Sequence, residues 1–140
     1  MKTCLQIAGT LQMLLAFAHF GFNRRFGWRE ELQKVSLFTR QVFFVHMRFL
    51  MLVLAGFGIV SLFCADDLLT PGRLPRVLLG GLTIFWVVRL YCQFFFYHPD
   101  LWRGNAFNTK VHVLFGMLWV FLTAVYATAL YQNNFAQGIP

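Results

Sequence analysis

The chain has 140 residues, of which 59% are apolar and only 12% are charged. Average soluble proteins have roughly 45–50% apolar and about 25% charged residues, so this chain has too little polar surface to cover its apolar side chains in water. The net charge of +7 resembles that of nucleic-acid-binding proteins, but the basic residues lie between apolar runs rather than along one polar face. These features exclude a soluble protein and a nucleic-acid partner, and they predict a single membrane domain over residues 1–140.

Four apolar runs are long enough to cross a bilayer, since about 20 helical residues span its hydrocarbon core. We expect these spans at residues 5–22, 42–64, 77–97 and 111–131. The runs are continuous, whereas the strands of a membrane β-barrel alternate between apolar and polar residues. The predicted fold is therefore an all-α integral membrane protein, a bundle of four transmembrane helices.

The loops between these spans carry two local signals. In the first loop, Phe26, Trp28, Leu32 and Val35 alternate with charged residues, which predicts a short helix lying in the membrane interface. In the second loop, residues 70–72 read Thr-Pro-Gly, which predicts a turn before the third span.

The distribution of Lys and Arg predicts the orientation of the spans. Loops one and three carry seven of these residues and the opposite side carries three. Because positive loops stay in the cytoplasm, we expect loops one and three to be cytoplasmic and both termini to lie outside. The first span also resembles a signal peptide, with Ala-Phe-Ala at 16–18, but Arg24 and Arg25 follow at once and oppose its translocation.

Polar side chains gather in the half of the predicted bundle beside loops one and three. At 1.5 Å per residue from the loop edges, Arg48 and Arg89 lie roughly 12–14 Å into the membrane. By the same measure His46, Gln93 and His19 lie about 7–9 Å deep. The polar groups of three different spans are therefore expected at two neighbouring levels.

Helical spacing assigns faces to these residues. Trp86, Arg89 and Gln93 stand at i, i+3 and i+7 and share one face of the third span. His46 and Arg48 are two residues apart and cannot face the same neighbour. With His112 near the start of the fourth span, the candidate ligand-binding residues are Arg48, Arg89, Gln93, Trp86, His46, His112 and His19.

No acidic residue lies within a predicted span, so Arg48 and Arg89 have no carboxylate at their own depth. Two interpretations stay open: each arginine extends its head group to the interface, or the two share a site for an anion such as a lipid phosphate. Backbone carbonyls, water and a carboxylate reaching in from loop one are the other candidate partners. We expect a protein without catalysis of its own that binds lipid or another anionic amphiphile. A subunit of a membrane complex or a homo-oligomer fits the same pattern.

A redox subunit is the alternative. Two imidazoles from different helices are the ligands of haem b, and the pairs His46/His112 and His19/His46 qualify; the same region is also a candidate for quinone binding. No cofactor is predicted outside this alternative, and the sequence does not identify a metal. Cys4 and Cys64 lie at the same predicted membrane face, either as a disulfide or as free thiols.

Four stretches stand at the ends and entries of spans two to four: QVFFVH, FWVVRLYCQFFFY, LWRGN and VHVLFGMLW. In these stretches the chain resembles small four-span bacterial inner-membrane proteins to which no activity is assigned. The resemblance covers nearly the whole chain. It implies a four-helix inner-membrane fold and no catalytic residue.

Overall fold

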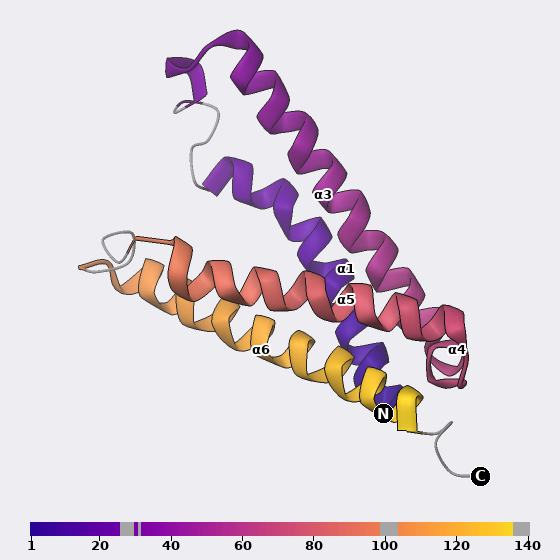
Figure 1. Cartoon of the computed structure of the whole chain (residues 1–140). Helices are drawn as coiled ribbons and strands as arrows, with labels where there is room; N and C mark the ends of the chain where they lie inside the picture. The colour runs from indigo at the N-terminus through magenta and orange to yellow at the C-terminus, as the bar shows by residue number, and fades with distance from the viewer. Residues whose placement is uncertain (26–29, 31, 99–103, 136–140) are drawn as a thin grey trace. The chain divides into compact units, whose positions relative to one another are not determined.

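The structure is a computed structural model, and it describes residues 1–25, 30, 32–98 and 104–135. Its elements in chain order are α1 (Lys2–Arg25), η1 (Leu32–Lys34), α3 (Leu37–Phe63), α4 (Ala65–Leu69), α5 (Arg73–Tyr91), η2 (Cys92–Phe96) and α6 (Ala106–Phe135) (Figure 1). The described residues include no β-strand. The prediction of an all-α chain is therefore confirmed for this part of the molecule.

Four of the helical segments are long and apolar enough to cross a membrane: Lys2–Gly21, Leu37–Phe63, Arg73–Phe96 and Ala106–Phe135. All four predicted runs are therefore long apolar helices, and the chain has the character of a multi-pass membrane protein. Each of the four helices begins before its predicted run, and at α3 and α6 a polar capping residue, rather than the apolar boundary, fixes where the helix begins. Ser36 shows this at α3, where its Oγ accepts a hydrogen bond from the Thr39 N–H at 3.2 Å.

The chain divides into two compact units, and each is described here by itself. One unit comprises residues 6–64, which hold most of α1 and all of α3. The other comprises residues 1–5 and 65–140, which hold α4, α5, η2 and α6. A single membrane domain and a four-helix bundle stay predictions.

In the unit of residues 6–64, α1 and α3 meet backbone to backbone at two glycines. A Cβ atom on Gly9 would lie 2.8 Å from the carbonyl oxygen of Gly58 and 2.8 Å from the amide nitrogen of Leu62. A Cβ on Gly58 would lie 2.9 Å from the Gly9 carbonyl oxygen. Membrane helices use glycine where their backbones approach this closely, so this pair fixes the contact between α1 and α3.

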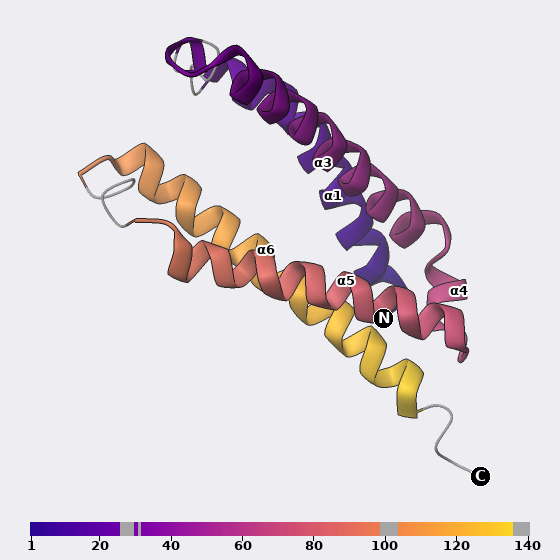
Figure 2. The ribbon, with the colours of Figure 1, turned by 45° about the horizontal axis from the view of Figure 1, so that its top comes forward.

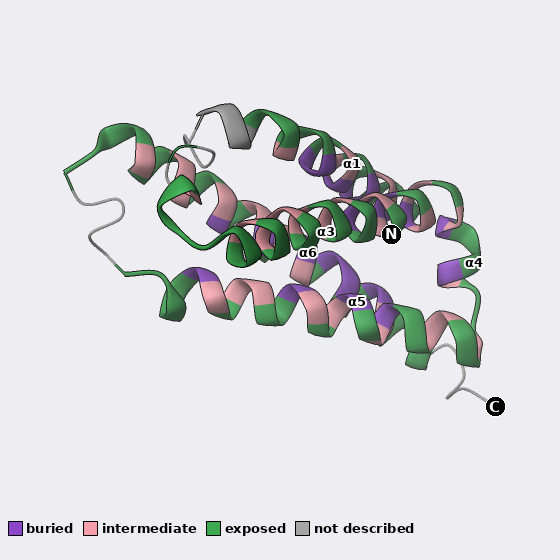
Figure 3. Ribbon diagram, turned by 90° about the horizontal axis from the view of Figure 1, so that it is seen from above, coloured by how far each residue is buried: buried purple, intermediate pink, exposed green. Residues whose placement is uncertain are grey.

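In the other unit, α5 and α6 lie side by side as an antiparallel hairpin (Figures 1 and 2). Both helices carry buried residues, as the purple segments of Figure 3 show, and the stacked rings of Trp86 and Trp119 join the two helices. The buried residues of α5 are Leu79, Leu82 and Trp86, and those of α6 include Trp119, Leu122, Val125, Tyr126 and Ala129. The spacing of three to four residues along each stripe is that of an α-helix.

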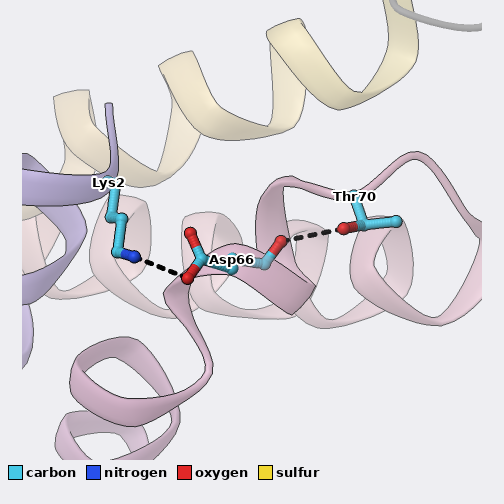
Figure 4. Close-up of polar contacts among 3 residues, drawn as sticks. All are labelled: Lys2, Asp66 and Thr70. Atoms are coloured by element: carbon cyan, nitrogen blue, oxygen red, sulfur yellow. Dashed lines mark hydrogen bonds and ion pairs between the residues drawn. The ribbon is translucent and has the colours of Figure 1, made fainter.

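The short helix α4 precedes the predicted turn at residues 70–72 and was not expected from the sequence. Asp66 and Asp67 occupy its first turn, where carboxylates interact favourably with the helix dipole. The Thr70 hydroxyl donates to the Asp66 carbonyl at 2.9 Å, and Lys2 Nζ forms an ion pair with Asp66 Oδ2 at 2.6 Å (Figure 4). Both charged side chains are more than half exposed, at 52% and 72%, so we expect this pair to stabilise the fold only slightly.

Asn133 holds the other end of α4. Its buried amide nitrogen donates to the carbonyl oxygens of Leu68 at 3.2 Å and Thr70 at 2.9 Å, which are acceptors left open where the helix ends. We expect Asn133→Ala to lower the free energy of unfolding by about 1–3 kcal/mol, because both carbonyls lose their donor. Detergent-induced unfolding followed by circular dichroism measures this change. The exposed neighbour Asn134→Ala is the control, and equal midpoints for the two variants would contradict the assignment.

The predicted helix in the first loop is only partly within the described residues. Leu32 to Lys34 form the 3-10 helix η1, so helical backbone is present there. Phe26 and Trp28 lie outside the described residues. The position of this segment in a membrane interface stays a prediction.

Candidate functional site

The last turn of α5 changes from an α-helix to a π-helix. The π-helix η2 covers Cys92–Phe96 and ends at Tyr97, whose backbone is extended. The Cys92 N–H points at the carbonyl oxygens of both Val88 and Arg89, where the two helix types meet. Single π turns inside helices occur often at functional sites, and this turn holds a buried amide, Gln93.

Gln93 uses all of its hydrogen-bonding capacity inside the protein. Its Oε1 accepts from Arg89 Nη1 at 3.4 Å and from Trp119 Nε1 at 3.2 Å. Its Nε2 points at His112 Nδ1, at 2.7 Å, and donates to the His112 carbonyl oxygen at 3.3 Å. Guanidinium and indole nitrogens only donate and a carbonyl oxygen only accepts, so these partners fix which amide atom is oxygen.

The same contacts fix the state of His112. Because the Gln93 amide nitrogen is a donor, the Nδ1 of His112 accepts, and the neutral ring carries its proton on Nε2. His112 is half-buried on α6, nineteen positions after Gln93. Gln93 therefore joins α5 to α6 through both the side chain and the backbone of His112.

Arg89 is held in place by two aromatic rings as well as by Gln93. Its Cζ lies 4.7 Å from the centroid of the Trp119 ring and 5.7 Å from that of Tyr97. Such cation–π contacts contribute on the order of 0.5–2 kcal/mol each, and more when the cation is desolvated. Arg89 is itself half-buried, so these contacts balance part of the cost of removing its charge from water.

The guanidinium of Arg89 nevertheless keeps most of its donors. The bond to Gln93 uses one of five N–H groups, and the others have no acceptor among the described residues. The described ion pairs do not include Arg89. A planar guanidinium with unused N–H donors has the geometry to bind an anion.

Trp86 forms the apolar floor of this cluster. Its ring is stacked on that of Trp119, with centroids 5.1 Å apart, and Phe115 is stacked on Trp119 at 5.4 Å. Trp86 is fully buried, and its Nε1 has no hydrogen-bond partner among the described residues. Its contribution is therefore to pack against Trp119, which in turn contacts Arg89.

The remaining predicted residues lie in the unit of residues 6–64. His46 Nδ1 bonds to the Val42 carbonyl at 2.8 Å and His19 Nδ1 to the Leu15 carbonyl at 2.7 Å. Since a carbonyl only accepts, each Nδ1 is the donor in its bond. Arg48 is exposed and has no hydrogen bond or ion pair with any described residue.

The structure thus brings four predicted residues together: Trp86, Arg89, Gln93 and His112. Arg48, His46 and His19 belong to the other unit, so the shared site of Arg48 with Arg89 and the pair His46/His112 stay predictions.

The sequence interpretation missed the roles of Trp119 and Tyr97. The signal for Trp119 was present, because His112, Gly116 and Trp119 stand at i, i+4 and i+7 on one face of α6.

Among the described residues, no group of three or more His, Cys, Asp or Glu side chains could hold a metal ion, and the three cysteines are free thiols.

The cluster around Arg89 has the chemistry of an anion site between two apolar helices, and it shows no nucleophile paired with a base among its described residues. No protein-family model, curated protein sequence or solved structure matches the chain significantly.

Proposed function

We propose that this protein is a multi-pass protein of the bacterial inner membrane that binds an anionic amphiphile at its α5–α6 hairpin, without catalysis of its own. One observation carries the proposal. Arg89 lies in a membrane-length apolar helix, is fixed by Gln93, Trp119 and Tyr97, and keeps N–H donors that no described residue accepts.

The surroundings of Arg89 support a bound anion rather than an internal ion pair. None of the four apolar helices contains an acidic residue within the predicted spans, and no carboxylate among the described residues is paired with Arg89. Membrane lipids are the anions that a side chain in such a helix meets, and intramembrane charges are seldom left without a partner. A lipid phosphate is therefore the natural counter-charge.

The distribution of positive charge suggests which leaflet supplies the lipid. Arg89 extends toward the end of α5 that leads into loop three, and loops one and three carry most of the Lys and Arg residues. By the positive-inside rule this face is cytoplasmic. The cytoplasmic leaflet also carries anionic lipids, so the proposed orientation and the proposed ligand agree.

Lipid retention tests the proposal. We expect Arg89→Leu, purified in mild detergent from its native membrane, to retain several-fold less anionic phospholipid than the wild type, because the variant loses the cation that holds the headgroup. Arg48→Leu tests the predicted contribution of the second arginine in the same way. Mass-spectrometric quantification of co-purified lipid per protein measures both effects.

Arg73→Leu is the matched control, since Arg73 is exposed at the other end of α5 and belongs to no described ion pair. Circular dichroism should show the same helix content in every variant. Unchanged anionic lipid in both Arg89→Leu and Arg48→Leu would rule out the proposed function.

Haem b binding or quinone handling remains the second candidate, and one observation favours it. His19 and His46 both bond a backbone carbonyl through Nδ1, which is how proteins orient a histidine whose Nε2 binds a metal. Both belong to the unit of residues 6–64. An absorbance spectrum of the purified protein separates the candidates: a Soret band that shifts on reduction with dithionite supports haem, and its absence removes the haem reading.

A further inference from the structure

We infer that Arg89 binds the phosphodiester of a singly charged phospholipid headgroup, of the phosphatidylglycerol class, through two parallel N–H···O bonds. The inference rests on the proposed function and names its ligand. Three properties of the site carry it: the contacts that restrain the guanidinium, its level in the helix, and the apolar side chains that flank it.

Two contacts restrain the guanidinium. Its Cζ lies 4.7 Å from the Trp119 ring centroid, and Nη1 donates to Gln93 Oε1 at 3.4 Å, which together limit its movement. A guanidinium restrained in this way presents a rigid edge with two parallel N–H groups. Such an edge matches an anion with two equivalent oxygens, as in a phosphodiester or a carboxylate.

The level of the guanidinium favours a headgroup phosphate. Helical side chains usually lean toward the N-terminus of their helix, but Arg89 contacts Gln93 and Tyr97, four and eight residues toward the C-terminus. The segment Arg73–Phe96 has 24 residues and a length of roughly 36 Å, against about 30 Å for the hydrocarbon core. When this helix is centred, the guanidinium therefore lies close to the boundary between acyl chains and headgroups.

The exposed side chains beside this level are aromatic and apolar. Tyr91 and Phe95 are stacked, with ring centroids 4.9 Å apart, and both are largely exposed. Phe94 and Phe96 are exposed as well. A water-soluble phosphate would leave these rings without a partner, whereas the glycerol and acyl chains of a phospholipid would cover them.

Replacing Arg89 by lysine tests whether two parallel N–H···O bonds hold the phosphodiester, because lysine keeps the charge but lacks the planar guanidinium. We expect delipidated wild-type protein to bind phosphatidylglycerol roughly tenfold more tightly than phosphatidylcholine, and Arg89→Lys to lose about five- to tenfold in affinity for phosphatidylglycerol although it keeps the charge. Native mass spectrometry of the full chain in detergent, titrated with each lipid, measures these affinities. Arg73→Lys is the control and should bind like the wild type.

The other arms of the titration use oleate and inorganic phosphate. Weak binding of both supports a phospholipid headgroup. Oleate binding as tight as phosphatidylglycerol would overturn the phosphodiester assignment, and so would displacement of phosphatidylglycerol by millimolar phosphate. If Arg89→Lys binds like the wild type while Arg89→Leu loses the lipid, the two-bond geometry is wrong and the proposed function stands. If Arg89→Leu binds phosphatidylglycerol as tightly as the wild type, both are wrong.

Discussion

Gly9→Leu is expected to lower the free energy of unfolding by about 2–3 kcal/mol, because the new side chain would have to enter space that the backbone of α3 already fills. A Cβ alone would lie 2.8 Å from the Gly58 carbonyl oxygen and 2.8 Å from the Leu62 amide nitrogen. Backbone atoms cannot move aside as the end of a flexible side chain can. The helices α1 and α3 would have to separate, and the remaining contacts along their interface would weaken.

A second glycine of α3 provides the control for this result. No described atom lies within 4 Å of a Cβ placed on Gly56, so we expect Gly56→Leu to be close to neutral or slightly stabilising, because leucine favours the helix more than glycine does. Unfolding in increasing mole fractions of sodium dodecyl sulfate, followed by circular dichroism, gives the midpoint for each variant. Equal midpoints for Gly9→Leu and Gly56→Leu would contradict the close contact between α1 and α3.

Gln93→Leu is expected to lower the free energy of unfolding by about 2–4 kcal/mol, the largest effect that we predict for a polar side chain. Leucine has a similar volume but leaves the buried Trp119 Nε1 without its acceptor and removes the bonds from Gln93 to His112. A buried group left unpaired costs on the order of 1–3 kcal/mol, and each further hydrogen bond lost within a membrane costs about 0.6 kcal/mol on average. The same detergent titration measures the loss.

The control for Gln93→Leu is Gln132→Leu on α6, since Gln132 is exposed and has no hydrogen bond with a described residue. We expect this variant to unfold like the wild type. Gln93→Leu should also retain less anionic lipid than the wild type, because Arg89 would lose the bond that limits its rotation. A stable, lipid-retaining Gln93→Leu variant would show that the cluster neither holds the helices together nor positions Arg89.

The two glycines and Gln93 join helix pairs by different means. Gly9 and Gly58 allow two backbones to touch, which increases the number of van der Waals contacts without any polar group. Gln93 instead connects α5 and α6 through hydrogen bonds that satisfy every donor and acceptor of its amide. A fully satisfied buried network is rigid, and this rigidity is what makes Arg89 suitable for binding a ligand of fixed geometry.

The sequence by itself determined the helical architecture and part of the site. Continuous apolar runs of about 20 residues can satisfy their backbone in a membrane only as helices, so the four helices followed from composition and length. The period of 3.6 residues placed Trp86, Arg89 and Gln93 on one face of the third span, and the structure has all three in contact with α6 or with each other. The missing acids were visible in the sequence as well, and they directed attention to Arg89.

Only the tertiary structure decided which residues complete these contacts. Periodicity describes one helix at a time, so it did not select Gly9 as the partner of Gly58, or Trp119 and Tyr97 as the rings around Arg89. The helix α4 is five residues long and has a polar first turn, so the sequence contains no apolar run that would predict it. Its end is held by Asn133, more than 60 positions away. The π-helix η2 is a local change in backbone hydrogen bonding that residue type does not predict. Gly58, Trp119 and Asn133 each come from a part of the chain distant from the residues they contact, and the physical reason is that packing between helices, not propensity within one, determines which atoms meet.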